Sequence, residues 1–195
     1  MILEAIVTTR NADGTINIAP MGPSCPDPSF QQFELRPFCS SNTWNNLQRT
    51  GQGVLHVTDD VLVFARSATR ADWQAKLEPA SQVDCEWLGD CCRCYEFETT
   101  WMDDTQPRAV VHCKTLSSHR FRDFLGFNRA KHAVIEASIL ATRIDFLPPT
   151  EIQNQLLDLQ KMVSKTGGEQ ERIAFELLEK FFVENGVIPT QGSAQ

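Results

Sequence analysis

The sequence lacks a hydrophobic run of the length needed to span a membrane. It also lacks an excess of basic residues: 18 Lys and Arg against 25 Asp and Glu give a formal net charge of −7. This balance argues against non-specific binding to nucleic acid, which requires a basic surface. No secretory signal is recognisable, because MILEAIVTTR has no basic start and carries polar residues inside a short apolar run. These absences predict a cytoplasmic protein that binds neither membranes nor nucleic acid.

The composition is otherwise that of a folded globular chain. Of the 195 residues, 42% are hydrophobic and 22% are charged, which are ordinary fractions for such proteins. A chain of this length can bury a sizeable core, so one domain, or one domain with a small appendage, is expected.

The cysteines point to reduced thiols. There are seven, an odd number in a chain without a recognisable export signal. Four are close together, and Cys91 and Cys94 form a C-x-x-C without a second such pair or an H-x₃-H to complete a tetrahedral metal site. Because this run resembles a strand, residues three apart are expected to point to opposite faces. The sequence therefore predicts small buried cysteines and no metal site for Cys85, Cys91, Cys92 and Cys94.

Short strand-like segments, separated by Gly, Asp and Pro, fill the first part of the chain. Their spacing favours an antiparallel barrel or sandwich over a βαβ sheet. The expected strands are 2–9, 15–22, 31–38, 53–60, 61–68, 83–89, 91–102 and 108–115.

Helical periodicity dominates the last third. Three helices are expected within 128–144, 148–168 and 169–186, the last with Ile173, Leu177 and Phe181 on one face. The predicted layout is a β domain at 1–125, a helical subdomain at 126–186 and a frayed tail at 187–195.

One stretch, RPFCSSNTWNNLQRTGQG, combines several capping residues with no acidic residue in the turn that follows. The first N–H groups of a helix have no partner inside the helix, and the helix dipole makes that end positive. Such an end is usually matched by a cap and an acidic residue, but an external anion such as phosphate also satisfies it. From this stretch alone, an ordinary cap and an anion site both stay open for Ser40, Ser41, Asn42 and Thr43.

A second expected helix start, FNRAKHAVIEA, places cations where they oppose the helix dipole. In a net-acidic protein, this concentration of positive charge indicates an anionic ligand, with a solvated basic face as the alternative. The residues concerned are Arg129, Lys131 and His132 after Asn128, together with Arg120 and Arg122 just upstream.

The segment GTINIAPMG is a third feature. It is a strand of small residues that ends at Pro20 and Gly22, so a flat ligand can lie close to its backbone. The alternative is a plain strand and turn.

Taken together, these stretches resemble the domain-of-unknown-function 447 family. That family belongs to the FMN-binding split-barrel superfamily, alongside flavin-reductase-like proteins, and the resemblance covers nearly the whole chain. The motif pair is N-x-A-P-x-G followed by T-x-x-N-L-x-x-x-G, formed here by Asn17, Ala19, Pro20 and Gly22 and by Thr43, Asn46, Leu47 and Gly51.

The resemblance implies an antiparallel FMN-binding split β-barrel followed by a small C-terminal helical subdomain, assembled as a homodimer. FMN would lie with its phosphate near the Ser40–Thr43 stretch and its ring along the 17–22 strand. The implied cofactor-binding residues are Asn17, Ala19, Pro20, Met21, Gly22, Arg36, Ser40, Ser41, Asn42, Thr43, Asn46 and Arg129.

The resemblance also implies a flavin-dependent oxidoreductase that uses NAD(P)H to reduce free flavin or an anionic substrate. The family's association with tetrahydromethanopterin-using organisms makes an anionic pterin one such substrate, received by Arg120, Arg122, Lys131 and His132 together with Arg129. No residue is required by the sequence as acid, base or nucleophile, and His56 and His112 are expected to be structural. A flavin carrier or sensor without turnover, and an interaction module without cofactor, are the alternatives.

Overall fold

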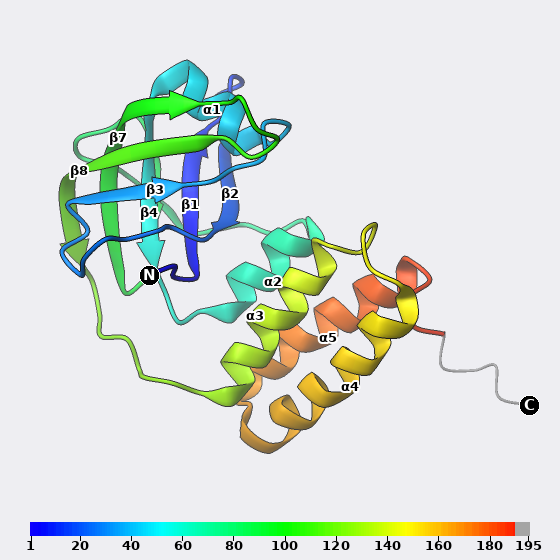
Figure 1. Cartoon of the computed structure of the whole chain (residues 1–195). Coiled ribbons are helices and arrows are strands. Elements are labelled where there is room, and N and C mark those ends of the chain that lie inside the picture. Colours follow the sequence, from blue (N-terminus) through cyan, green and yellow to red (C-terminus); the bar gives the residue numbers. More distant parts are fainter. Residues whose placement is uncertain (190–195) are drawn as a thin grey trace, which may run out of the picture. The chain divides into compact units, whose positions relative to one another are not determined.

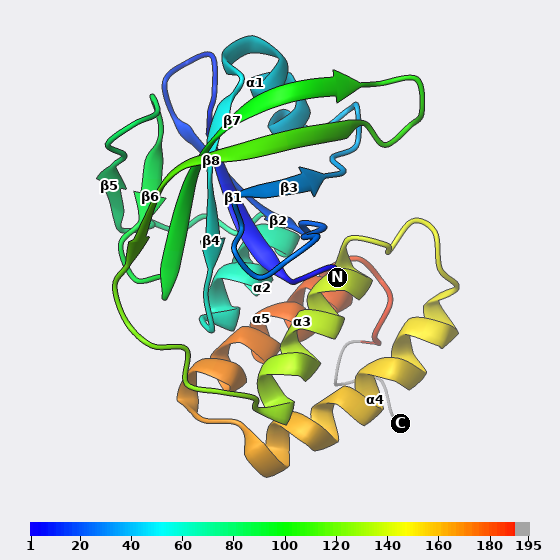
Figure 2. The same ribbon diagram turned by 60° about the vertical axis from the view of Figure 1, so that its left-hand side comes forward.

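The structure is a computed structural model in which residues 1–189 are described, so most of the predicted frayed tail lies outside the described residues. The chain forms two compact units (Figures 1 and 2). The sheet unit comprises Met1–Asp59 and Gln74–Phe124, and the helical unit comprises Asp60–Trp73 and the chain from Leu125 onward. Among the helices of the described part, none has the length and apolar character of a membrane span.

The sheet unit is built on a six-stranded antiparallel sheet in the order β2-β1-β4-β7-β8-β3. A two-stranded hairpin of β5 and β6 and one helix, α1, complete it. The bounds are β1 Ala5–Arg10, β2 Ile16–Met21, β3 Gln32–Leu35, α1 Asn42–Thr50, β4 Gln52–Val57, β5 Leu77–Pro79, β6 Glu86–Leu88, β7 Arg93–Asp103 and β8 Val110–Arg120. The prediction of an antiparallel sheet is confirmed.

The segment around Ser24 connects strand β3 to the start of the chain. Ser24 forms isolated bridges with Glu34 on one side and with Ile2 on the other. The N–H of Glu34 donates to the Ser24 carbonyl at 2.9 Å. The N-terminal residues thus lie beside the far edge of the sheet as well as leading into β1.

The two faces of the sheet have different partners. Directly opposed residues of antiparallel strands share a face, so Val7, Leu55 and Tyr95 lie together in the apolar core. The other face is covered by the β5–β6 hairpin through polar contacts. The Thr8 hydroxyl donates to the Glu86 carbonyl at 2.6 Å.

His56 lies beneath this hairpin and is completely buried. Its Nε2 accepts the Leu88 N–H at 3.1 Å, so Nδ1, 3.2 Å from the Ile6 carbonyl, carries the proton of a neutral ring. Burial lowers the pKa of His56 from 6.5 to about 4. His56 is therefore a structural residue, as its position in a strand predicts.

Glu96 fastens the same hairpin. Its fully buried carboxylate accepts hydrogen bonds from the Gln82 N–H at 2.5 Å and from the Ser81 hydroxyl at 2.8 Å. It also lies 3.0 Å from His119 Nε2. Burial alone would raise the pKa of Glu96, but these hydrogen bonds lower it below its usual value.

The helical unit contains four helices: α2 Val61–Thr69, α3 Arg129–Ala141, α4 Pro149–Thr166 and α5 Glu169–Glu184. The three helices expected in the last third are confirmed. On α5, however, Ile173 is exposed, and the buried face is formed by Ala174, Phe175, Leu178 and Phe182. Leu177 and Phe181 of the predicted face are partly buried and pack against the same core, so the predicted face borders the buried one.

The strand predicted at 61–68 is wrong, because these residues form α2. Asp60 caps the helix by accepting the Leu62 N–H at 3.0 Å, and Arg70, at φ 54°, ends it in the left-handed region. Val61 and Ala65 pack into the core of the helical unit. A short apolar run rich in valine does not distinguish a strand from a buried helix, and here tertiary packing decides.

The prediction that Cys91 and Cys94 diverge is also wrong. β7 begins at Arg93, so Cys91 precedes the strand and the alternation of faces does not apply to it. The Cys94 thiol lies close to that of Cys91, and this neighbour together with burial raises the pKa of Cys91. Their predicted burial is confirmed, and all seven cysteines are free thiols.

Candidate functional site

Helix α1 begins with an ordinary side-chain cap. Ser41 has extended backbone angles, and its Oγ accepts the Trp44 N–H at 3.2 Å while donating to the Phe38 carbonyl at 2.7 Å. The Asn45 N–H reaches the Ser41 carbonyl at 3.1 Å. The capping half of the prediction is confirmed.

The positive end of α1 is nevertheless not compensated. Its first turn contains no acidic residue. Within residues 1–189, the backbone N–H groups of Asn42 and Thr43 have no hydrogen-bond acceptor. Ser40 and Asn42 are exposed beside them. This end can therefore bind an anion in the way that phosphate is bound at helix starts.

Strand β2 meets α1 at this point. Asn17 Nδ2 donates to Thr43 Oγ1 at 3.1 Å, so the two halves of the sequence motif are brought into direct contact. Thr43 is only 2% exposed. Because its hydroxyl contacts Asn17, its backbone N–H is the group that Thr43 can offer to a ligand at the helix end.

Thr9 and Asn11 also hold this junction together, and sequence reasoning missed both. Asn46 Nδ2 donates to Thr9 Oγ1 at 3.0 Å and to Asn11 Oδ1 at 2.8 Å. Asn17 Nδ2 also lies 3.3 Å from Thr9 Oγ1. Thr9 and Asn11 lie outside the motifs, and only the pairing of Thr9 with Asn17 across two predicted strands hints at their role. We call the junction of β2 and the start of α1, with Thr9 and Asn11, the β2–α1 corner.

Strand β2 also forms an edge of the sheet, because it pairs only with β1 (Figure 1). About half of the backbone N–H and C=O groups of an edge strand point away from the sheet. Ala19 and Met21 share the face of Asn17, and every residue of β2 is half-buried. Pro20 is tolerated because this strand is an edge. Backbone groups are thus available for a ligand along β2.

Gly22 has an explanation inside the protein. A Cβ at this position would lie 3.1 Å from Ile2 Cγ2, so the glycine allows the N-terminal segment to approach closely.

Arg36 has an acidic partner of its own. Its Nε lies 2.6 Å from Glu34 Oε1, and Glu34 Oε2 is also 3.6 Å from His112 Nε2. The Arg36 side chain is 62% exposed. The structure thus pairs Arg36 with Glu34 of strand β3, and none of the ion pairs or hydrogen bonds of Arg36 within the described residues involves the corner.

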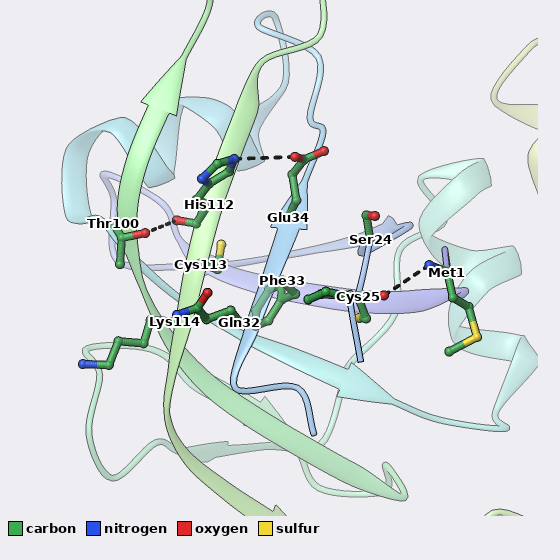
Figure 3. Close-up of a pocket in the computed structure, with 11 residues that line it drawn as sticks. Met1, Ser24, Cys25, Gln32, Phe33, Glu34, Thr100, His112, Cys113 and Lys114 are labelled. Carbon is green, nitrogen blue, oxygen red and sulfur yellow. Dashed lines mark hydrogen bonds and ion pairs between the residues drawn. The ribbon is translucent and has the colours of Figure 1, made fainter. Parts of the chain in front are cut away.

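A cavity of about 500 Å³ lies on the side of β3 and β8. Figure 3 shows Glu34 and His112 facing each other across the two strands, while Lys114 extends away from them. The Met1 amino group donates to the Cys25 carbonyl at 3.1 Å at the other end. None of the residues that the sequence predicts as site residues lines this cavity.

The predicted cations of the sheet unit both have acidic partners. Arg120 pairs with Asp123. Arg122 pairs with Asp59, a carboxylate that is only 4% exposed, and donates to the Asp90 carbonyl at 3.2 Å. Arg122 therefore neutralises a buried charge inside the protein.

The start of α3 differs from that of α1. Asn128 Oδ1 accepts the N–H groups of Ala130 at 2.8 Å and Lys131 at 3.2 Å. The Lys131 ammonium lies 3.1 Å from Glu171, on α5, and both side chains are largely buried. Burial would raise the pKa of Glu171, but Lys131 and the Gly168 N–H lower it.

Arg129 and His132 complete the predicted set. Arg129 lines a shallow hollow of about 280 Å³ with Lys161, Lys165, Met162 and Asp158. Lys161 pairs with Asp158 at 2.8 Å, whereas Arg129 and Lys165 form no ion pair within residues 1–189. The ring of His132 packs edge-on against Phe127 at 5.9 Å. Within the same residues, no group of three or more His, Cys, Asp or Glu side chains could hold a metal ion.

Sequence comparison identifies the family. The model described as "Protein of unknown function (DUF447) N-terminal domain" matches residues 3–122, and that described as "Protein of unknown function (DUF447)" matches residues 128–180. The chain belongs to the DUF447 family. The resemblance found in the sequence is thereby confirmed. No curated protein matches this DUF447 chain.

Solved structures share its fold. An FMN-bound DUF447 protein of Methanosarcina mazei is 23% identical, with a TM-score of 0.81 over 92% of this chain and 94% of that one. The 2-nitrobenzoate 2-nitroreductase NbaA of Pseudomonas fluorescens is 19% identical, with a TM-score of 0.51 over 60% of this chain and 64% of that one. An FMN-binding protein of Thermus thermophilus with bound 1-cyclohex-2-enone is 14% identical, with a TM-score of 0.51 over 60% and 70%.

Proposed function

We propose that this DUF447 chain binds FMN at the β2–α1 corner of a split β-barrel. The observation that carries the proposal is the 3.1 Å contact between Asn17 and Thr43, because it joins an edge strand to a helix start that lacks an anionic partner. The FMN-bound M. mazei protein, which shares this fold over 92% of the chain, supports it.

The residues at the corner fit the parts of FMN. The phosphate, which is close to a dianion, is matched by the N–H groups of Asn42 and Thr43 and by the side chain of Ser40. Ser41 would contribute by exchanging its hydrogen bond to the Phe38 carbonyl for one to the phosphate. The open edge of β2 offers backbone donors and acceptors to the polar edge of the flavin ring, at Asn17–Gly22. Bound FMN supplies the electron-transfer chemistry, and the protein binds and orients it.

Two of the predicted FMN-binding residues, Arg36 and Arg129, lie outside the β2–α1 corner. To bind the phosphate, Arg36 would have to leave its ion pair with Glu34. A guanidinium can bind phosphate through two parallel hydrogen bonds. Arg129, at the start of α3 in the helical unit, is the second proposed anion contact for FMN.

The proposed reaction is the reduction of an anionic substrate or of free flavin by NAD(P)H, in a cytoplasmic homodimer. Arg120, Arg122 and Lys131 already have carboxylate partners. For the anionic substrate, such as a pterin, the proposal therefore turns to Arg129 with Lys161 and Lys165. With Asp158 included, their hollow has a net charge of +2.

One observation favours a second function, an FMN carrier or sensor without turnover. The side chains that meet at the corner are serine, threonine and asparagine, and none is a strong acid or base at neutral pH.

The test is titration of the purified chain with FMN, followed by the quenching of flavin fluorescence. We expect saturable binding that Asn17→Ala weakens and Lys180→Ala, a matched change at an exposed lysine of α5, leaves unchanged. Absence of binding, or equal loss in both variants, would overturn the proposal. Reduction of the bound flavin by NADH or NADPH then separates an oxidoreductase from a carrier.

A further inference from the structure

We propose that Thr9 is a positioning residue: it fixes the side-chain amide of Asn17 so that Asn17 Oδ1 is the group offered to the ligand. This inference rests on the proposed function and extends it to residues outside the family motif. It also defines the chemistry of the ligand group that must lie opposite Asn17.

Thr9 is placed for this role by the sheet. It is the direct cross-strand partner of Asn17 in the β1–β2 ladder and is fully buried. Its Oγ1 lies 3.3 Å from Asn17 Nδ2 and 3.0 Å from Asn46 Nδ2. A single hydroxyl therefore contacts the amide of the edge strand and that of helix α1.

Counting the hydrogen bonds of Asn17 gives the orientation of its amide. An asparagine amide has two N–H donors and one acceptor oxygen. Both donors of Asn17 are used, one toward Thr9 and the other toward Thr43. Its Oδ1 accepts no hydrogen bond from residues 1–189. It is also not one of the polar atoms of these residues that are both buried and without a hydrogen bond, so it is not closed off from solvent. The oxygen is thus the part of Asn17 that a ligand can reach.

Asn46 makes this arrangement resistant to rotation. Its two donors go to Thr9 and to Asn11 Oδ1, and the side chain is only 5% exposed. Turning the Asn46 amide would place its oxygen against Asn11 Oδ1, two acceptors facing each other, which is unfavourable. Asn46 therefore keeps its donor on Thr9 Oγ1, the hydroxyl that also contacts Asn17 Nδ2. The corner therefore presents an acceptor at Asn17 and selects a ligand with a hydrogen-bond donor there. In FMN, this donor is the ring imide N–H or a ribityl hydroxyl.

Three variants of the full chain test the proposal. Thr9→Val keeps the shape of the side chain but removes the hydroxyl, and Thr9→Ser restores it. Thr8→Val is the matched control, because Thr8 is also fully buried, is the next residue, and directs its hydroxyl to the hairpin on the other face. The readouts are the dissociation constant for FMN and the side-chain amide NMR signals of Asn17 and Asn46 without FMN.

We expect Thr9→Val to weaken FMN binding about tenfold, the effect of losing one well-placed hydrogen bond. It should also shift the amide signals of Asn17 and Asn46, whereas Thr9→Ser and Thr8→Val keep both readouts close to wild type. Unchanged amide signals in Thr9→Val, or equal loss of FMN affinity in Thr8→Val, would overturn the proposal. If wild type binds no FMN, the proposed function fails, while the amide signals still decide the role of Thr9.

Discussion

Helices α1 and α3 both lack an acidic residue near their positive N-terminal end, but their surroundings compensate this end differently. Neither has an acidic residue in its first turn. At α1, the N–H groups of Asn42 and Thr43 have no acceptor within the described residues. At α3, Asn128 accepts two N–H groups, and Glu171 of α5 pairs with Lys131 in the first turn.

The difference shows that a helix end is compensated by its surroundings in space. The first turn of α3 obtains its carboxylate from another helix of the same unit, so its basic residues do not require an external anion. The first turn of α1 faces an edge strand whose contacting side chain, Asn17, is neutral. The comparison therefore supports α1, and not α3, as the place of the proposed anion site.

The largest expected effect is on stability, at α3. Lys131→Met leaves Glu171 buried without its partner, and removing one member of a buried ion pair typically destabilises a protein by about 3 to 5 kcal/mol. Lys180→Met is the control, because Lys180 is 72% exposed and pairs with Glu184 on the surface. Urea unfolding of both variants checks this; a loss below about 1 kcal/mol in Lys131→Met would contradict the pairing as the reason for this lysine.

Acid should destabilise the two units over different pH ranges. The pKa of His56 is about 4 against 6.5 when unfolded, so the unfolded chain binds the proton first. Stability of the sheet unit should fall as the pH drops below 6.5, by about 3 kcal/mol in total. The pKa of Glu171 is below its usual 4.5, so its contribution is lost only below that value. Hydrogen exchange of β4 and α5 amides from pH 7 down to pH 3 measures both; equal onset in the two units would contradict this.

Removing the caps separates ligand binding from stability. Ser41→Ala and Asn128→Ala should each destabilise the protein by about 1 kcal/mol, the usual effect of a lost N-cap. Only Ser41→Ala should also weaken FMN binding, by about tenfold, because this cap holds the N–H groups of Asn42 and Thr43 at the proposed anion site. FMN titration and thermal unfolding of the two variants provide the check. Equal loss of FMN affinity in both would remove the distinction between the helix starts.

The smallest effect is expected at Arg129. A negative charge at this position interacts favourably with the start of α3 and with Lys165, so Arg129→Glu should stabilise the protein by about 0.3 to 1 kcal/mol. Lys180→Glu makes the same change of charge away from a helix start. Thermal unfolding at low salt compares the two, and destabilisation by Arg129→Glu would show that the arginine has a favourable partner in solution.

Local sequence signals predicted most of the strands, the start of α1 and the three final helices, because these depend on periodicity and capping; the short strand β5 was missed. The motif pair named Asn17 and Thr43, but their contact became visible only in the structure. The pairing of Lys131 with Glu171 could not be predicted, because it depends on the packing of α3 against α5. The same holds for α2, whose valines are compatible with either secondary structure until the helical unit buries them, and for Thr9, which no local pattern distinguishes from Thr8.

The open edge of β2 has a consequence for the solubility of the protein. An uncovered strand edge is a template on which another chain can add a strand, and proline is one means of blocking such addition. Pro20 removes one N–H from β2, but its other outward groups are available. A cofactor lying along this strand would shield them, so preparations depleted of FMN should aggregate faster than saturated ones.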